Sequence, residues 1–256
     1  SSTPGALPPF EGHPTSGPGW IGRICPLTVE NALLLRQQFS WLNPVSLADR
    51  PATIGCGDRL GRATTGQLRA IRKFAVAPVL AQQSMRELTL TRRTFVGVLS
   101  DAVWGVFQAG YTEGFGADAD HLKTLTDIQT AIDAGYTMIT LDLSAVLRPE
   151  AASFSDAEIA TEFERLAEPT RRAILNAYAD RPFQLDGETL TLSASEVRRC
   201  AVLYTAALDF AKEVFDLLVS RRGVGRFDLE ISVDETTTPT LPSHHLFFIR
   251  ELRRRG

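Results

Sequence analysis

Hydrophobic and polar positions along this chain follow two alternating patterns, one typical of strands and one typical of helices. Short apolar runs predict five strands, near residues 52, 76, 112, 137 and 227. Apolar residues at helical spacing follow side chains that can cap a helix, and they predict helices beginning at Thr28, Thr65, Thr94 and Thr124. Strands that alternate with helices in this way indicate a parallel sheet with right-handed crossovers.

The alternation pauses after the fourth predicted strand. A helical insertion is expected there, over about residues 150–222. It contains two longer helices with capping signals and a small hairpin between them, expected at Ser155–Ala179, Ser193–Ser220 and Phe183–Leu192. After the fifth strand, a last helix is expected to begin at Ser243 and to end near Arg254.

The residues after the first predicted strand help to separate two folds that contain a parallel sheet. A dinucleotide-binding open sheet needs a third glycine after Gly55–Gly57, and this chain has Asp58 and Arg59 instead. We therefore predict an α/β fold, a (β/α) TIM-type barrel, which is incomplete because only about five of its eight strands are found. Residues 1–24, rich in Gly, Pro, Ser and Thr, are expected to form an irregular leader, and residues 25–256 the N-terminal portion of the barrel.

Composition and charge exclude several classes of protein. The 256 residues carry a formal net charge of −3 and are 44% hydrophobic, which is ordinary for a globular protein and excludes a strongly basic nucleic-acid binder. No run of about 18 apolar residues is present, so no membrane span is expected, and no secretory signal is found at the N-terminus. The three cysteines are far apart and odd in number, so we expect buried reduced thiols and a cytoplasmic protein.

Polar side chains follow each predicted strand. In a barrel, functional side chains gather at the C-terminal ends of the strands. The series in this chain consists of Asp58 and Arg59, Gln82 and Gln83, Asp118, Asp120, His121 and Lys123, Asp142, and finally Asp234 and Glu235. Because loops are also polar for other reasons, the series by itself fits a functional site and an ordinary surface equally well.

The first and third clusters each allow a functional and a structural interpretation. Asp58 and Arg59 form either a turn with a local ion pair or a site in which the guanidinium binds a carboxylate through two hydrogen bonds. Asp120 and His121 combine a possible base with a possible ligand of a divalent metal. The structural alternative is that Asp120 caps the helix that begins near Lys123.

The later clusters are less specific. Asp234 and Glu235 end an alternating strand and are either metal ligands, proton-transfer groups or an Asx turn. His244 and His245 lie in the first turn of the last helix, where adjacent side chains do not face the same side. The chain has no Cys–Cys or His-x3-His spacing typical of structural zinc, and no P-loop or nucleophile elbow.

Taken together, the motifs resemble those of the tagaturonate epimerase family of hexuronate catabolism. Five segments carry the resemblance, in the expected order: Gly55–Gly61, Pro78–Leu88, Gly114–Thr124, Ser232–Thr236 and His245–Leu252. Several long motifs in order are far more specific than any one of them. Members of the family are longer, so the resemblance implies that this chain is the N-terminal part of such an enzyme.

The resemblance implies a metal-dependent TIM-type barrel that interconverts tagaturonate and fructuronate. Asp120 would be the proton acceptor, Glu235 the proton donor, and His121 a ligand of a divalent cation, which could be Zn, Mn, Fe, Co or Ni. The remaining metal ligands would belong to the stretch past residue 256. The run of threonines from Thr236 departs from the family pattern and leaves the exact substrate open, so a second hypothesis is a related isomerase or aldolase acting on another sugar acid. A third hypothesis is a non-catalytic sugar-acid-binding protein with half a site.

The chemistry of a sugar acid accounts for these residue types. Arg59 would hold the carboxylate, Gln82 would bind hydroxyl groups, and Asp58 and Lys123 complete the expected substrate-binding set. The inverted carbon is not adjacent to the ketone, so its C–H bond is not acidified. A retro-aldol cleavage and re-addition would solve this problem, with a metal stabilising the enediolate and with two groups that move the hydroxyl proton.

The expected division of the metal ligands can be tested by calorimetry on the 256-residue chain. Because only His121 among the expected ligands lies within it, we predict that the chain alone binds divalent cations with a dissociation constant weaker than about 1 μM. Micromolar or tighter binding would contradict the expected ligand set.

Overall fold

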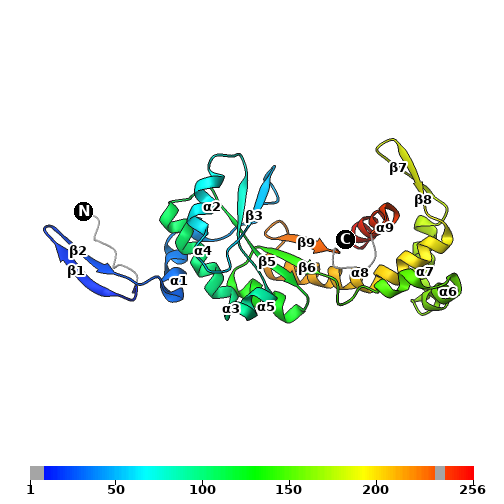
Figure 1. The fold of residues 1–256 in the computed structure, drawn as a ribbon, viewed down its shortest axis with the longest axis horizontal. Helices are drawn as coiled ribbons and strands as arrows, with labels where there is room; N and C mark the ends of the chain where they lie inside the picture. The colour runs from blue at the N-terminus through cyan, green and yellow to red at the C-terminus, as the bar shows by residue number, and fades with distance from the viewer. Residues whose placement is uncertain (1–8, 234–239) are drawn as a thin grey trace. The chain divides into compact units, whose positions relative to one another are not determined.

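A computed structural model describes residues 9–233 and 240–256. Its main sheet has five parallel strands, and their order in space is their order in the sequence (Figure 1). These strands are β3 (Thr53–Gly57), β4 (Ala77–Ser84), β5 (Gly116–Leu122), β6 (Met138–Asp142) and β9 (Asp228–Ser232). The α/β class and the five strands are thereby confirmed, although β5 begins later than predicted. The described residues form an open sheet and not a closed barrel.

The chain divides into two compact units. The first comprises Ser1–Thr140 and Arg221–Glu230, and the second comprises Leu141–Ser220 and Ile231–Gly256. Strands β6 and β9 contribute residues to both units. Within the described residues, no helix is long and apolar enough to cross a membrane.

Helices pack on the sheet of the first unit (Figure 1). The helices that contact its strands are α2 (Thr64–Ile71), α3 (Met85–Thr91), α4 (Phe95–Ala109) and α5 (Leu125–Ala134). Helix α1 (Val29–Gln38) and the short 3-10 helix Ser40–Leu42 pack against α4. The side chains of Thr28, Thr94 and Thr124 cap α1, α4 and α5 as predicted, each accepting a backbone N–H hydrogen bond. The predicted cap of α2 by Thr65 is wrong, because the carboxylate of Asp58 accepts the first N–H groups of that helix instead.

Apolar side chains of α4 form much of the core of the first unit. Val98, Leu99, Ala102, Val103 and Val106 are all buried, which confirms the predicted helical spacing. Helix α4 crosses α2 closely at Gly105, where α4 has no side chain. These contacts hold the helices against the strands whose C-terminal ends carry the predicted polar series.

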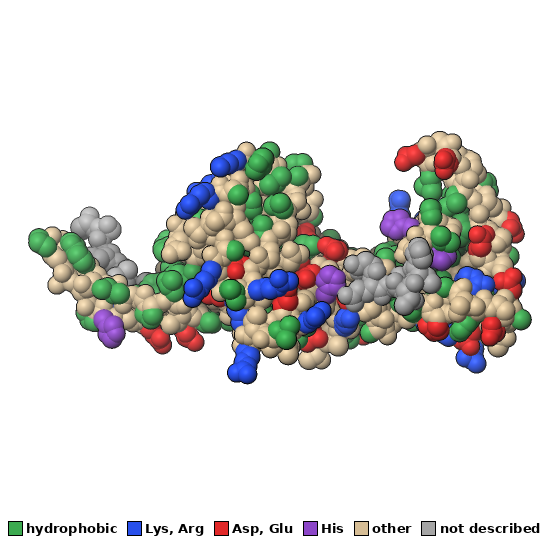
Figure 2. Space-filling model, viewed as in Figure 1, with side chains coloured by type: hydrophobic (Ala, Val, Ile, Leu, Met, Phe, Trp, Pro, Cys, Tyr) green, Lys and Arg blue, Asp and Glu red, His purple; other side chains and the backbone are tan. Residues whose placement is uncertain are grey.

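Residues 13–24 correct the predicted irregular leader. They form a hairpin of β1 (His13–Gly17) and β2 (Trp20–Ile24), paired antiparallel through a two-residue turn at Pro18 and Gly19. Gly19 has a φ of +79°, a conformation that glycine adopts without strain. Pro18 and Gly19, which belong to the composition that suggested an irregular leader, therefore form the turn of the hairpin. Ile21 is 89% exposed, and Figure 2 shows hydrophobic side chains on this hairpin, at the left of the view.

The second unit contains the predicted insertion. Its elements are the 3-10 helix Pro149–Ser153, α6 (Asp156–Glu164), α7 (Glu168–Tyr178), β7 (Pro182–Leu185), β8 (Glu188–Thr191), α8 (Ala194–Arg222), which ends in the first unit, and α9 (Pro242–Arg255). The predicted helix Ser155–Ala179 is two helices, because Pro169 would break a continuous helix but is tolerated in the first turn of a new one. Either Ser155 or Asp156 was expected to cap the first of them, and Ser155 is the cap, in a complete capping box with Glu158. The predicted start at Ser243 is wrong, because α9 begins at Pro242 without a side-chain cap.

Two glycines on the crossing helices provide a matched test of the packing. A Cβ at Gly105 of α4 would lie 2.6 Å from the Cβ of the buried Thr64, whereas nothing lies within 4 Å of a Cβ at Gly66 of α2. We predict that Gly105→Ala lowers the free energy of unfolding by about 1–3 kcal/mol. Gly66→Ala should raise it by about 1 kcal/mol, because alanine favours the helix. Urea denaturation of both variants would check this, and a stabilising Gly105→Ala would contradict the close helix crossing.

Candidate active site

A cavity of about 610 Å³ lies at the C-terminal ends of the first strands of the main sheet. Among the described residues, its lining belongs to the first unit: Gly57, Asp58, Arg59, Leu60, Arg62, Ala63, Gln82, Glu87 and Asp120. Four of the predicted site residues, far apart in the sequence, therefore meet around one cavity. They are Asp58, Arg59, Gln82 and Asp120.

A bulge in β4 aims Gln82 toward β5. The pairing of β4 shifts by one residue against both neighbouring strands, and Ala81 has a left-handed φ of +56°. After this bulge, Gln82 Nε2 donates to Asp118 Oδ2 at 3.0 Å. Gly55 of β3 leaves room for this side chain, because a Cβ there would lie 2.6 Å from Gln82 Oε1. A bulge of this kind changes which side chains reach a site.

Asp118 is a buried carboxyl group of β5. It is 0% exposed and accepts hydrogen bonds from Gln82 and from Thr140 Oγ1, the latter at 3.1 Å. Burial, followed by the negative charge of Asp120, raises the pKa of Asp118 to about 7. The neutral form of Asp118 is therefore substantially populated near neutral pH. Asp118 does not line the cavity, but its neighbour Asp120 does.

Asp120 and His121 contact each other at the end of β5. His121 Nδ1 lies 2.7 Å from Asp120 Oδ1, and both side chains are only partly exposed. Neighbouring side chains of a regular strand point in opposite directions, but His121 has a left-handed φ of +54°, which breaks the alternation. The alternative role of Asp120 as a helix cap is excluded, because Thr124 caps α5.

The Asp120–His121 pair fits a metal ligand with its supporting carboxylate. If the ring donates from Nδ1 to this carboxylate, Nε2 is the ring nitrogen that can coordinate a metal. Histidines that bind metals are usually oriented by such a carboxylate. Among the described residues, no group of three or more His, Cys, Asp or Glu side chains is placed to hold a metal ion, so His121 would need ligands from outside them.

The structure favours the turn interpretation for Asp58. Its carboxylate is buried and accepts hydrogen bonds from the backbone N–H groups of Leu60, Ala63 and Thr64 at 3.3, 2.6 and 3.3 Å. Burial opposes ionisation, but these backbone donors outweigh it and lower the pKa of Asp58. A direct contact of Asp58 with substrate stays a prediction. The expected local ion pair is wrong, because Arg59 pairs with Glu87 instead.

The other predicted residues lie outside this set of lining residues. Lys123 is exposed beyond the end of β5, and Asp142 is buried at the end of β6. Asp234 and Glu235 lie outside the described residues, so the role predicted for Glu235 stays a prediction. His244 contacts Tyr204 Oη at 3.2 Å within the second unit.

Two charged cavity residues were missed by the sequence patterns. Arg62 is exposed and lines the cavity beside Arg59. Glu87 lines it from α3, where it completes a capping box with Ser84 and pairs with Arg59. The spacing of Ser84 and Glu87 is the usual signal of a capping box and could have revealed both the missed helix α3 and the position of Glu87.

Comparison with known proteins gives consistent findings. A model of the tagaturonate epimerase family matches residues 16–256. A tagaturonate/fructuronate epimerase from Thermotoga maritima is 40% identical over 233 residues, which are 91% of this chain and 47% of that protein. A glycerol complex of fructuronate-tagaturonate epimerase from Cohnella laeviribosi has a TM-score of 0.88 and 38% identity, and the match covers 96% of this chain and 49% of that chain. The native structure of the same enzyme also has a TM-score of 0.88, at 37% identity. This chain spans about half the length of these relatives.

The raised pKa of Asp118 predicts a specific dependence of stability on pH. Between the ordinary value of 3.8 and about 7, the folded state binds more protons than the unfolded chain. The free energy of unfolding therefore falls as pH rises through this window, by up to about 1.4 kcal/mol per pH unit. Asp118→Asn removes the titrating group, and we predict that denaturation measured across this window loses that decline.

The control is Asp186→Asn, at an exposed turn in the second unit, where asparagine tolerates the left-handed backbone. This variant should keep the pH dependence of the unmodified chain. An unchanged pH profile in Asp118→Asn would show that Asp118 titrates alike in the folded and unfolded chains.

Proposed function

This chain belongs to the tagaturonate epimerase family, and on that premise we propose that its cavity forms part of the active site of an enzyme interconverting tagaturonate and fructuronate. The family is a family of isomerases. The observation that carries the proposal is the Asp120–His121 pair at the C-terminal end of β5, beside a cavity with two arginines. That arrangement supplies a base, an oriented imidazole and positive charge for a sugar acid.

We further propose that the open sheet is a segment of a (β/α) barrel. Its order β3-β4-β5-β6-β9 follows the chain without the reversal typical of a doubly wound sheet. The cavity lies at the C-terminal ends of the strands, where barrel enzymes carry their active sites. The matched relatives are about twice as long, which supports a division of the barrel and its site between this chain and further sequence.

The substrate carboxylate would bind to the guanidinium groups at the rim of the cavity. Arg59 is 72% exposed, and its pairing with Glu87 leaves it near the cavity. Arg62 lines the same space and supplies a second guanidinium. Arginine binds carboxylates through two parallel hydrogen bonds, which fixes the orientation of the substrate as well as its position. Gln82, held by Asp118, would contact a hydroxyl group from the cavity floor.

The proposed reaction is a retro-aldol cleavage followed by re-addition. Asp120 removes the proton from the hydroxyl group on the carbon to be inverted. The bond from that carbon to the carbon beside the ketone breaks, its electron pair forms an enolate, and the hydroxyl-bearing carbon becomes an aldehyde. After the aldehyde turns its other face, the bond forms again, and Glu235 returns the proton to the new alkoxide.

We propose that His121 contributes one ligand to a divalent metal cation. A cation bound there would supply positive charge that stabilises the developing oxyanion. His121 is suited to this role by its contact with Asp120, because a carboxylate beside Nδ1 orients the ring. The identity of the metal stays open among Zn, Mn, Fe, Co and Ni.

We also propose a cytoplasmic location, based on the cysteines. Cys25, Cys56 and Cys200 are all free thiols, and the last two are buried, whereas Cys25 is only half-buried. Burial raises the pKa of Cys200 to about 12. Because the thiolate is the form that is oxidised, this thiol resists oxidation near neutral pH. Free thiols of this kind are typical of reducing compartments.

Asp120→Asn in the full-length protein tests the proposed function. Asparagine keeps the shape of the side chain but cannot accept the proton, so we predict that turnover falls by about 10²–10⁴-fold. Interconversion of tagaturonate and fructuronate would be followed by NMR, with Asp186→Asn as the control that keeps full activity. Normal turnover in Asp120→Asn would refute the assigned base. Turnover of a different sugar acid by the unmodified protein would favour the related isomerase or aldolase.

A further inference from the structure

Arg93 is a half-buried cation next to the active-site cavity but not on its surface. It lies in the short connection between α3 and α4, and its side chain is 16% exposed. None of the residues lining the cavity is Arg93. A guanidinium withdrawn from water in this way needs several hydrogen-bond partners to offset the loss of hydration.

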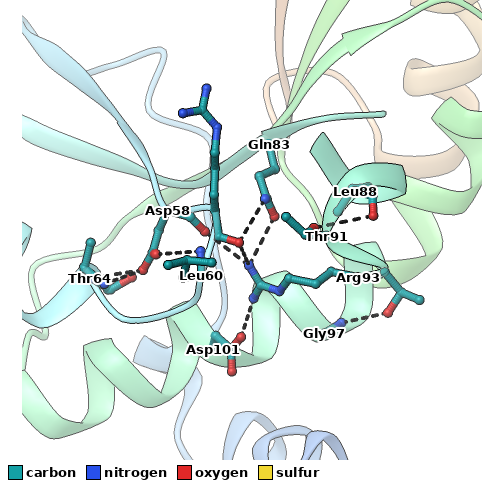
Figure 3. Close-up of polar contacts among 12 residues, drawn as sticks. Asp58, Leu60, Thr64, Gln83, Leu88, Thr91, Arg93, Gly97 and Asp101 are labelled. Atoms are coloured by element: carbon teal, nitrogen blue, oxygen red, sulfur yellow. Dashed lines mark hydrogen bonds and ion pairs between the residues drawn. The ribbon is translucent and has the colours of Figure 1, made fainter. Parts of the chain in front are cut away.

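The partners of Arg93 come from three separate segments. Nη1 donates to the backbone oxygens of Asp58 and Arg59 at 3.2 and 3.1 Å, and to Gln83 Oε1 at 3.2 Å. The other terminal nitrogen pairs with Asp101 of α4. Figure 3 shows the guanidinium between the side chains of Gln83 and Asp101. One side chain thus joins the segment after β3 to β4 and to α4.

The anchored segment is the loop of residues 58–63, which contributes most of the cavity lining. Its backbone oxygens at Asp58 and Arg59 bond to Arg93, and Gln83 Nε2 donates to the Arg59 oxygen at 3.4 Å. The far end of the loop is tied by the Asp58 carboxylate, which accepts the N–H groups that begin α2. The loop backbone is therefore held at both ends.

A glycine in the loop reinforces this arrangement. Gly61 has a φ of +68°, and a Cβ there would collide with the carboxylate of Asp101. Asp101 therefore fills the space that a side chain at position 61 would need, while it pairs with Arg93. The loop, Arg93 and Asp101 form one packed group beside the cavity.

We propose that Arg93 is a positioning residue, which fixes the backbone of Asp58 and Arg59 so that the guanidinium groups of Arg59 and Arg62 meet the carboxylate of the sugar-acid substrate. This inference rests on the proposed function for its substrate. Hydrogen bonds from a charged donor are stronger than those between neutral groups, so the loop depends on Arg93 more than on Gln83. Preorganised binding groups lose less entropy when the substrate binds.

Arg72 provides a matched control for a merely structural role. Its Nη2 donates to the backbone oxygens of Ala109 and Gly110, both at 2.9 Å, and so it also joins two segments of the first unit. It is not among the residues that line the cavity. Loss of Arg72 should destabilise the protein without loosening the loop of residues 58–63.

The first experiment measures hydrogen–deuterium exchange in the full-length protein and needs no activity. We expect Arg93→Gln to speed the exchange of the Leu60, Ala63 and Thr64 amides by about tenfold or more, because the loop opens locally. Arg72→Gln should leave these amides unchanged. Equal exchange of the loop amides in Arg93→Gln and the unmodified protein would overturn the proposal, whatever the reaction proves to be.

The second experiment measures steady-state kinetics with tagaturonate. For Arg93→Gln we expect KM to rise about tenfold, with kcat changed much less, because the lost contact positions the substrate and takes no part in bond breaking. In an Arg59→Gln background, Arg93→Gln should raise KM less, since the two residues act through one contact. An equal rise of KM in Arg72→Gln, or fully additive effects of Arg93→Gln and Arg59→Gln, would overturn it. No turnover by the unmodified protein would instead refute the proposed function, and the exchange experiment would still decide the role of Arg93.

Discussion

The need to give every buried polar group a partner constrains the architecture beneath the cavity. Asp118 lies inside the sheet, where an unpaired carboxyl group would cost several kcal/mol. Its partners come from both neighbouring strands, Gln82 of β4 and Thr140 of β6. The bulge of β4 and the absence of a side chain at Gly55 are what let Gln82 reach it. The floor of the cavity thus depends on the hydrogen bonds that the buried Asp118 accepts from both neighbouring strands.

Unfavourable backbone conformations accompany the site residues. Ala81 and His121 both have left-handed backbones, each at the C-terminal part of a strand beside the cavity. For residues other than glycine, this conformation costs about 1 kcal/mol or more. In both cases it changes the direction of a side chain: Gln82 meets Asp118, and His121 meets Asp120. The strained backbone at Ala81 and His121 lowers the stability of the fold, and in return it brings polar side chains together beside the cavity.

Local patterns predict much of this molecule, because local forces decide it. The alternation of strands and helices, the caps at Thr28, Thr94 and Thr124, and the gathering of Asp58, Arg59, Gln82 and Asp120 all follow from spacing and strand order. The order of the five motifs predicts the tagaturonate epimerase family, which the comparisons confirm.

What local patterns do not predict depends on contacts between distant segments. The carboxylate of Asp58 replaces Thr65 as the cap of α2 only because the preceding loop folds back onto the helix. The proposed role of Arg93 depends on its hydrogen bonds to the backbone carbonyl groups of Asp58 and Arg59, which lie more than thirty residues earlier in the chain. The left-handed backbone at Ala81 has no sequence signal, since alanine does not favour it. The hairpin at residues 13–24 was missed because Gly and Pro are typical both of turns and of irregular chain.

The division into two units also has a spectroscopic consequence. The three tryptophans, Trp20, Trp41 and Trp104, all belong to the first unit, and the second unit has none. Trp104 is 9% exposed and donates its indole N–H to the Thr28 oxygen, whereas Trp20 is 54% exposed. Intrinsic tryptophan fluorescence thus reports on the cavity-bearing unit alone. Circular dichroism reports on both units, so a difference between the two signals during unfolding would reveal whether the units melt together.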